Sequence, residues 1–229
     1  MQITITREYH FDKLSAHFPF LEYLPKELRR HSGRIFNRDE RTTEDYQILF
    51  IGKSGYGKSS TINALTGHNA MQTSDIEACT KDAFTVEYSL NAQKTRYLSF
   101  CDLPGIAESE KTDNEYLALY ENMLYHCFCI VYVLRADMRD YTRDLALFRE
   151  KLSPYRARIV IAINCADKAE PTSRESTDLT GEQIDNLERK RSSVSQIFHM
   201  PKEQVIYYSA RERINLDALM HQIYNRMTI

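Results

Sequence analysis

The sequence predicts an α/β fold in which a doubly wound, mostly parallel sheet is covered by helices on both faces. Three observations favour this fold class. Short apolar stretches alternate along the chain with longer stretches whose apolar residues repeat at helical spacing. The continuous apolar run from Cys127 to Leu134 is typical of a strand that is buried on both faces. A glycine-rich turn at residues 52–57 joins another apolar run to a helix.

The chain is expected to divide into an N-terminal helical arm with a linker, residues 1–45, and a main domain, residues 46–229. The arm is expected to hold two short amphipathic pieces, and the polar residues 39–45 are expected to form the linker. The apolar residues of the pieces are Leu14, Phe18 and Leu21 in the first, and Leu28, Ile35 and Phe36 in the second. The second piece is basic on its polar side, which fits either a helical arm packed on the domain with its charges solvated, or a segment that docks on a protein partner or an anionic membrane.

The main domain is expected to contain six strands separated by helices. The expected strands cover residues 48–51, 83–90, 96–101, 127–134, 159–163 and 205–208, of which the second and third form a hairpin. The first expected helix covers residues 58–66, and later helices carry Leu117, Tyr120 and Leu124, then Leu145, Phe148 and Leu152. Thr180 and Gln183 form a capping box for a long helix with Ile184, Leu187, Val194 and Ile197, and Asn215 caps a final helix. Residues 68–82 and 168–178 are expected to be loops.

The composition is typical of a folded globular protein, with 42% hydrophobic and 27% charged residues. A net charge of -2 gives no reason to expect nucleic acid as a required partner. Charged residues interrupt any N-terminal signal peptide, and the longest apolar run is too short to span a bilayer, so no membrane partner is required. The five cysteines have unrelated spacings, which predicts reduced thiols and a cytoplasmic location rather than a zinc site.

The loop after the first expected strand reads Gly-Lys-Ser-Gly-Tyr-Gly-Lys-Ser at residues 52–59 and fits the phosphate-binding pattern G-x-x-x-x-G-K-[ST]. Glycines let the backbone curl so that successive amide groups point at phosphate oxygens, and the following helix directs its positive end to the same place. The lysine adds a point charge between the terminal phosphates, and the serine after it supplies a hydroxyl to Mg²⁺. The candidate residues are Ser54, Gly55, Tyr56, Gly57, Lys58, Ser59 and Ser60.

Ligands of such a sheet lie beyond the carboxyl ends of its strands, so the residues that follow each strand are candidates. Asp102 follows the third expected strand and can hold Mg²⁺ through a water, while the amide of Gly105 can reach a γ-phosphate. Thr80 lies between the phosphate loop and this strand, where it can supply a second hydroxyl to Mg²⁺. The metal candidates are therefore Ser59, Thr80 and Asp102.

The residues after the last two strands predict a purine site. A carboxylate at Asp167 can accept two hydrogen bonds from guanine, whereas adenine presents an acceptor at the same edge and is repelled. Asn164 is expected to brace this loop and to form a hydrogen bond with the edge of the base. The sequence Ser209-Ala210-Arg211 is expected to offer backbone amides to the guanine oxygen and the Arg211 stem to the base face. Lys168 completes the candidate set.

Taken in order, these motifs resemble those of the Era-like GTPases of the translation-factor-related class. The branch that they resemble most holds small bacterial GTPases of the ribosome-binding type, with the interferon-inducible GTPases as more distant relatives. The resemblance covers residues 46–229 and implies a P-loop GTPase fold, GTP and GDP as ligands, and Mg²⁺. It also implies roles in hydrolysis for Lys58, Thr80 and Gly105.

The sequence departs from the pattern of these relatives at three positions. Cys165 stands where a lysine usually packs along the nucleotide, and Lys168 or Arg211 is a possible substitute. Ile106 follows the Asp-x-x-Gly motif where many relatives carry a glutamine that positions water, and isoleucine can neither donate nor accept a proton. Tyr56 is large for a phosphate loop.

These features lead to two hypotheses from different classes. The first is a GTP-hydrolysing molecular switch that is slow alone and is stimulated by a homodimer across the nucleotide face or by a protein effector. The alternative is a scaffold that binds GTP without hydrolysing it, which Ile106 and Tyr56 favour. An ATPase or kinase is disfavoured by Asp167 and by the Ser-Ala-Arg sequence.

Overall fold

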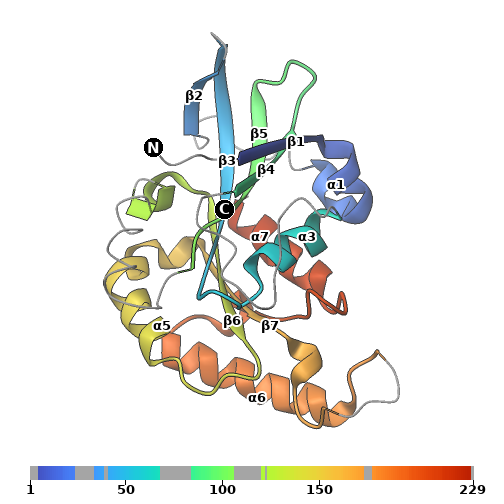
Figure 1. Cartoon of the computed structure of the whole chain (residues 1–229), viewed down its shortest axis with the longest axis vertical. Coiled ribbons are helices and arrows are strands. Elements are labelled where there is room, and N and C mark those ends of the chain that lie inside the picture. The colour runs from blue at the N-terminus through green and yellow to red at the C-terminus, as the bar shows by residue number, and fades with distance from the viewer. Residues whose placement is uncertain are drawn as a thin grey trace.

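The structure is a computed structural model that describes residues 5–23, 34–38, 41–67, 84–105, 120–121, 123–172 and 177–227. These residues form an eight-stranded sheet with helices on both faces (Figure 1). The predicted α/β doubly wound fold class is confirmed. The predicted number of six strands is wrong, because two strands from the first 45 residues join the same sheet.

The sheet has the strand order β1-β4-β5-β3-β6-β7-β8, with β2 paired to the early part of β3. Its strands are β1 (Ile5–His10), β2 (Arg34–Arg38), β3 (Arg41–Ile51), β4 (Phe84–Ser89), β5 (Arg96–Asp102), β6 (Cys129–Arg135), β7 (Ile159–Asn164) and β8 (Val205–Tyr207). The strands β5, β3, β6, β7 and β8 are all parallel to their neighbours in this part of the sheet. Their carboxyl ends therefore meet at one edge of the sheet. The residues of the sequence motifs come directly after these strand ends.

The helices are α1 (Phe11–His17), α3 (Lys58–Thr66), α5 (Thr142–Leu147), α6 (Gly181–Phe198) and α7 (Leu216–Met227). In Figure 1, α3 and α7 lie side by side on one side of the sheet and α5 and α6 lie on the other. On the second side, the ring of Tyr132 on β6 contacts Phe148 and Phe198, which hold the chain after α5 and the end of α6 against the sheet. None of the helices in the described ranges has the length and apolar character that a membrane span needs.

Among the first 45 residues, those that the structure describes are only partly helical. Leu14, Phe18 and Leu21 lie in or next to α1 and the short helix Pro19–Tyr23, and all three are buried in the main core, as the amphipathic pattern predicts. The prediction of a second helical piece is wrong for Ile35 and Phe36, which lie in strand β2. β1 pairs in parallel with β4 at the edge of the sheet. The division of the chain at residue 45 stays a prediction.

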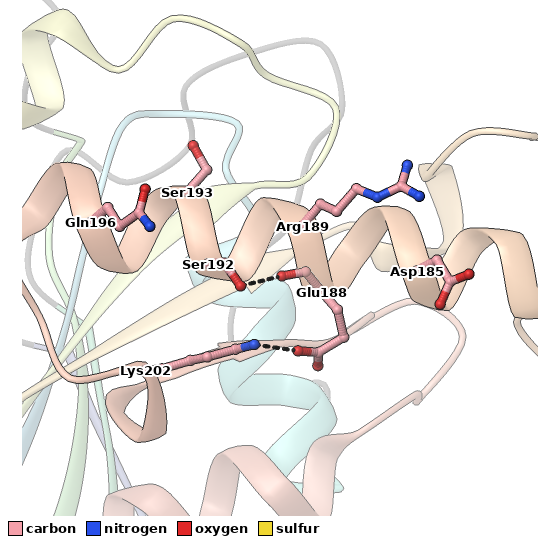
Figure 2. A pocket seen from close by; sticks show the side chains of 7 residues that line it. All are labelled: Asp185, Glu188, Arg189, Ser192, Ser193, Gln196 and Lys202. Atoms are coloured by element: carbon pink, nitrogen blue, oxygen red, sulfur yellow. Dashed lines mark hydrogen bonds and ion pairs between the residues drawn. The ribbon is translucent and has the colours of Figure 1, made fainter.

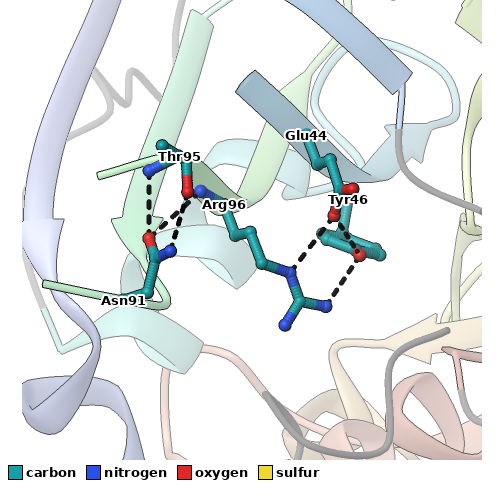
Figure 3. A network of polar contacts seen from close by, with 5 residues as sticks. All are labelled: Glu44, Tyr46, Asn91, Thr95 and Arg96. Atoms are coloured by element: carbon teal, nitrogen blue, oxygen red, sulfur yellow. Dashed lines mark hydrogen bonds and ion pairs between the residues drawn. The ribbon is translucent and has the colours of Figure 1, made fainter. Parts of the chain in front are cut away.

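The predicted linker at residues 39–45 is wrong for residues 41–45, which begin β3. Polar contacts across strands stabilise this extension (Figure 3). Glu44 on β3 faces Arg96 on β5, and their side chains form an ion pair of 3.2 Å. The guanidinium of Arg96 also donates to the hydroxyl of Tyr46 at 2.8 Å. One residue on, the carboxylate of Asp45 accepts hydrogen bonds from Ser99 and Gln47.

Two helices of the main domain agree with the sequence at their ends. The helix α3 covers residues 58–66 as expected and ends at Gly67, whose φ of 69° is left-handed. Before α6, Thr180 and Gln183 form the predicted capping box. The side-chain amide of Gln183 also donates to the carbonyl oxygens of Ala169 and Pro171, which explains why it is buried.

The predicted apolar face of α6 is only half right. Leu187 and Val194 are buried, whereas Ile184 and Ile197 are 40% and 37% exposed. Phe198 takes the inner position at the end of the helix because it packs against the rings of Tyr132 and Phe148.

Several predicted segments lie wholly or partly outside the described residues, among them Leu28 of the second amphipathic piece and residues 173–176 of the loop expected at 168–178. The loop at residues 68–82 lies outside them, and so does Leu117 in the helix expected from about residue 114. The described residues 120–121 and 123–126 are helical, with Tyr120 and Leu124 buried.

Candidate functional site

The glycine-rich loop that follows β3 lies against the ends of two neighbouring strands. Gly57 has a φ of 87°, and a Cβ atom there would lie 2.3 Å from the side-chain nitrogen of Asn164. A Cβ atom at Gly52 would lie 2.5 Å from the carbonyl oxygen of Val133 on β6. Both positions require glycine, because the neighbouring strands approach the loop too closely for a side chain.

The ammonium group of Lys58, the first residue of α3, lies inside this loop. It donates hydrogen bonds to the carbonyl oxygens of Gly52 at 3.0 Å and of Lys53 at 3.2 Å, and Lys58 is buried. Nearby in the loop, Ser54 and Ser60 are half-buried and Gly55 is exposed. A cation held beside the N-terminus of a helix and a curled backbone can bind phosphate oxygens.

Ser59, in the first turn of α3, lies next to Asp102, the last residue of β5. The hydroxyl of Ser59 donates a hydrogen bond to the carboxylate of Asp102, which is buried at 1% exposure. A hydroxyl and a carboxylate are the oxygen ligands that Mg²⁺ prefers, so the donor set fits this ion. The third metal candidate, Thr80, lies outside the described residues.

The described segment that begins with β4 continues past Asp102 to Gly105. The hydroxyl of Tyr120 donates to the carbonyl oxygen of Pro104, so the residue before Gly105 is tied to the helical segment at residue 120. Ile106 and the segment that follows it lie outside the described residues. The roles predicted for Thr80 and Gly105 therefore stay predictions.

Asn164, the last residue of β7, connects three loops. Its side-chain nitrogen donates to the carbonyl oxygen of Tyr56 at 3.0 Å. Its side-chain oxygen accepts from the backbone amides of Cys165 at 2.8 Å and Ala210 at 3.1 Å. The side chain of Asn164 therefore braces the loops around it. Through these contacts the phosphate loop and the two loops after β7 and β8 form one site.

Asp167 and Ser209 face each other across the last two loops. The hydroxyl of Ser209 donates to one carboxylate oxygen of Asp167 at 2.6 Å and accepts from the backbone amide of Glu212 at 3.0 Å. This contact fixes the direction of the carboxylate while Asp167 remains half-buried. A fixed, partly exposed carboxylate can accept hydrogen bonds from a flat polar ligand such as a purine.

The other candidates for base contacts have different surroundings. The amide of Ala210 is used by Asn164, and its predicted contact with a base stays a prediction. Lys168 is exposed. The side chain of Arg211 is 82% exposed and lies 3.7 Å from the carboxylate of Glu212.

The structure explains the large Tyr56 in the phosphate loop. Tyr56 is buried, and the ammonium of Lys53 lies 5.6 Å from the centre of its ring. The same ammonium forms an ion pair of 2.7 Å with Asp144 of α5, which also accepts from the hydroxyl of Tyr132 at 3.0 Å. Burial works against the charge of Lys53, but the contact with Asp144 outweighs it and raises the pKa of Lys53. Tyr56 thus fills the space between the loop and α5.

Arg135 also contacts the phosphate loop, although the sequence motifs do not include it. It is the last residue of β6, and its guanidinium donates to the carbonyl oxygen of Gly55 at 3.2 Å. The signal was present in the sequence, because Arg135 follows an apolar strand in the same way as Asp102 and Asn164 do. For Lys53 and Asp144 there was no such signal, since their contact joins a loop to a distant helix.

A hollow of about 580 Å³ opens along α6 and is lined by none of the residues above (Figure 2). Its lining includes an ion pair of 2.9 Å between Lys202 and Glu188. The remaining lining residues are Asp185, Arg189, Ser192, Ser193 and Gln196. This polar surface is separate from the loops at the sheet edge.

Comparison with known proteins gives one family and several similar structures. The family model described as 50S ribosome-binding GTPase matches residues 47–165. The uncharacterised protein YfjP of Escherichia coli strain K12 is 34% identical over 182 residues, which cover 79% of this chain and 62% of YfjP. The chain thus spans less than two thirds of the length of this curated relative.

Two solved structures have a similar fold. Era in complex with MgGDPNP and part of 16S ribosomal RNA has a TM-score of 0.61 at 20% identity, covering 80% of this chain and 57% of Era. Toc33 from Arabidopsis thaliana in complex with Mg²⁺ and GMPPNP has a TM-score of 0.59 at 18% identity, covering 95% of this chain and 91% of Toc33. At these identities the two structures establish a shared fold.

Proposed function

Because the chain belongs to the 50S ribosome-binding GTPase family, we propose that it binds GTP with Mg²⁺ at the sheet edge and hydrolyses it to GDP and phosphate. Membership of this family confirms the resemblance that the motifs indicate. In the proposed function the protein is a nucleotide-dependent switch. The observation that carries the proposal is the position of Asn164, whose side chain joins the phosphate loop to the loops of Asp167 and Ser209.

Lys58 and the loop amides would bind the phosphates. The ammonium of Lys58 now binds two loop carbonyl oxygens, and phosphate oxygens would replace or join these acceptors. Ser59 and Asp102 would hold Mg²⁺, which neutralises charge on the β- and γ-phosphates when it is bound. Thr80 or the Gly105 region is proposed to help place the attacking water, as the motif order implies.

Asp167 would select the base. Its carboxylate is held in one direction by Ser209, at 2.6 Å, and can accept from the N1–H and the amino group of guanine. Replacing this carboxylate by the amide in Asp167→Asn is expected to shift the preference toward xanthine nucleotides, because xanthine presents an oxygen where guanine has its amino group.

Hydrolysis by the isolated chain is proposed to be slow. Ile106 cannot orient water, so stimulation by dimerisation across the nucleotide face or by a protein effector would be needed. For the similar Toc33, dimerization is important for the GTPase activity, which supports the same arrangement here. The four described cysteines are free thiols, which supports a reducing compartment such as the cytoplasm.

The test is phosphate release under single turnover over a range of protein concentrations. We expect a slow rate that rises with protein concentration or with an added effector. A fast rate that does not depend on concentration would contradict the proposed stimulation. If bound GTP stays intact through long incubation, the non-hydrolysing scaffold is the correct reading.

A further inference from the structure

The guanidinium of Arg135 contacts the phosphate loop, and its strand pairs with the strand that leads into residues 165–168, here called the base loop. Arg135 ends β6 and is paired in register with Asn164, the last residue of β7. One of its nitrogens donates to the carbonyl oxygen of Gly55 at 3.2 Å. Arg135 therefore contacts the phosphate loop from the side on which the Asn164 to Asp167 segment begins.

Asp137 fixes the orientation of this guanidinium. Two nitrogens of Arg135 donate to the two carboxylate oxygens of Asp137, at 2.9 and 2.6 Å. Both side chains are partly exposed, at 25% and 31%. A pair with two parallel hydrogen bonds holds the planar cation in one orientation.

Cys165 is the first residue of the base loop. It follows Asn164 directly and is half-buried; burial raises the pKa of its thiol, and the charge of Arg135 opposes this effect. A thiol is short and carries no charge at neutral pH, so it cannot itself supply a cation here. The other candidates, Lys168 and Arg211, are exposed, and Arg211 lies beside Glu212.

We propose that Arg135 is a further nucleotide-binding residue, which contacts the sugar and base part of the guanine nucleotide and supplies the cation that Cys165 does not. This inference rests on the proposed function and extends it, because it names the contact that joins the two halves of the site. A guanidinium in this position can stack on a purine face or donate to the ribose oxygens.

The test compares Arg135→Ala with Arg189→Ala, an exposed arginine on α6, by calorimetry with Mg²⁺-GTP and Mg²⁺-GDP. Arg135→Ala is expected to weaken both nucleotides about tenfold, because a charged contact to the shared part of the ligand is lost. The ratio of the two affinities should stay unchanged, and Arg189→Ala should bind as the wild type does. Adding Cys165→Lys to Arg135→Ala should restore most of the affinity.

Inorganic triphosphate with Mg²⁺ distinguishes a contact from loop bracing. If Arg135 contacts the sugar and base, Arg135→Ala should lose clearly more affinity for GTP than for triphosphate, although its contact with Gly55 is lost for both ligands. An equal loss for triphosphate and GTP would overturn the proposal, because Arg135 would then act only through Gly55. Unchanged GTP affinity in Arg135→Ala would also overturn it. Absence of guanine nucleotide binding by the wild type would instead refute the proposed function and this inference with it.

Discussion

The side-chain amide of Asn164 donates a hydrogen bond of 3.0 Å to the carbonyl oxygen of Tyr56, and this contact ties the end of β7 to the phosphate loop. The same side chain accepts from the amides of Cys165 and Ala210. The contact is close because Gly57 has no side chain to keep the strand away. One buried amide therefore sets the relative positions of the loops that would bind the two ends of a nucleotide.

Asn164→Ala is expected to lower the free energy of unfolding by about 2 kcal/mol or more, because buried backbone groups lose their partners. GTP affinity should fall with it. Urea unfolding measures the first effect and calorimetry the second. Asn186→Ala is the matched control, since its hydrogen bond to Glu170 lies at the surface, and it should cost about 0.5 kcal/mol or less. Equal losses of unfolding free energy in the two variants would contradict a stabilising role for the contacts of Asn164 with the loops.

Asp144→Asn is expected to lower the free energy of unfolding by about 2 kcal/mol, because it leaves the charge of Lys53 beside a neutral group. Asp144 is fully buried and Lys53 is 18% exposed. The surface pair of Glu188 and Lys202 gives the control, and Glu188→Gln should cost less than about 1 kcal/mol. A loss in Asp144→Asn no larger than that of the control would contradict a bracing role for the pair.

The pH dependence of the free energy of unfolding in Asp144→Asn gives a second test of the pair of Lys53 and Asp144. The pKa of Lys53 is raised in the folded state, so its contribution to stability is complete below the ordinary lysine pKa and is lost as the pH rises through the folded value. Wild-type stability should therefore decline in the alkaline range by an amount that Asp144→Asn does not show. Unfolding at a series of alkaline pH values measures the difference.

Alkylation of Cys165 is expected to be slow at neutral pH and to keep rising beyond the pH at which an ordinary thiol reaches its full rate. Burial raises the pKa of Cys165, although Arg135 and Lys168 oppose this effect. Bound nucleotide should slow the reaction because Cys165 lies in the base loop. The experiment uses a Cys79→Ser background, since the other described cysteines are buried. A rate that levels off at the ordinary thiol pKa, or that ignores nucleotide, would contradict this placement.

Leu14→Ala is expected to lower the free energy of unfolding by about 3 kcal/mol, because it leaves a cavity in the main core. Leu14 is fully buried, whereas its neighbour Lys13 is exposed. Lys13→Ala should therefore change stability by about 0.5 kcal/mol or less. Thermal or urea unfolding makes the comparison. A small loss in Leu14→Ala would contradict the packing of the N-terminal segment on the main core.

The sequence was most informative where local patterns decide the structure. The strand before Gly52, the helix from Lys58 and the capping box at Thr180 follow from apolar runs, glycine placement and capping residues. The start of β3 could not be found in this way, because Glu44 is satisfied by Arg96 on a strand about fifty residues away. Polar residues that pair across strands resemble a loop until the pairing is known.

The candidate site divides in the same way. The motifs located Lys58, Ser59, Asp102, Asn164 and Asp167, and the structure brings these residues to one edge of the sheet. The partner of Lys53 in α5 carries no local signal. The position of Arg135 at the end of an apolar strand marked it in the sequence as a candidate. Its contact with Gly55 could not be predicted, because it depends on the order of the strands in the sheet.

The central claim is that this sheet edge binds a guanine nucleotide. Calorimetry with Mg²⁺-GTP and Mg²⁺-ATP on the whole chain tests it most directly, with Lys58→Ala as the variant in which binding should be lost. GTP is expected to bind about a thousandfold more tightly than ATP, because adenine places an acceptor against the carboxylate of Asp167. Equal affinity for the two nucleotides, or GTP binding that survives in Lys58→Ala, would contradict it.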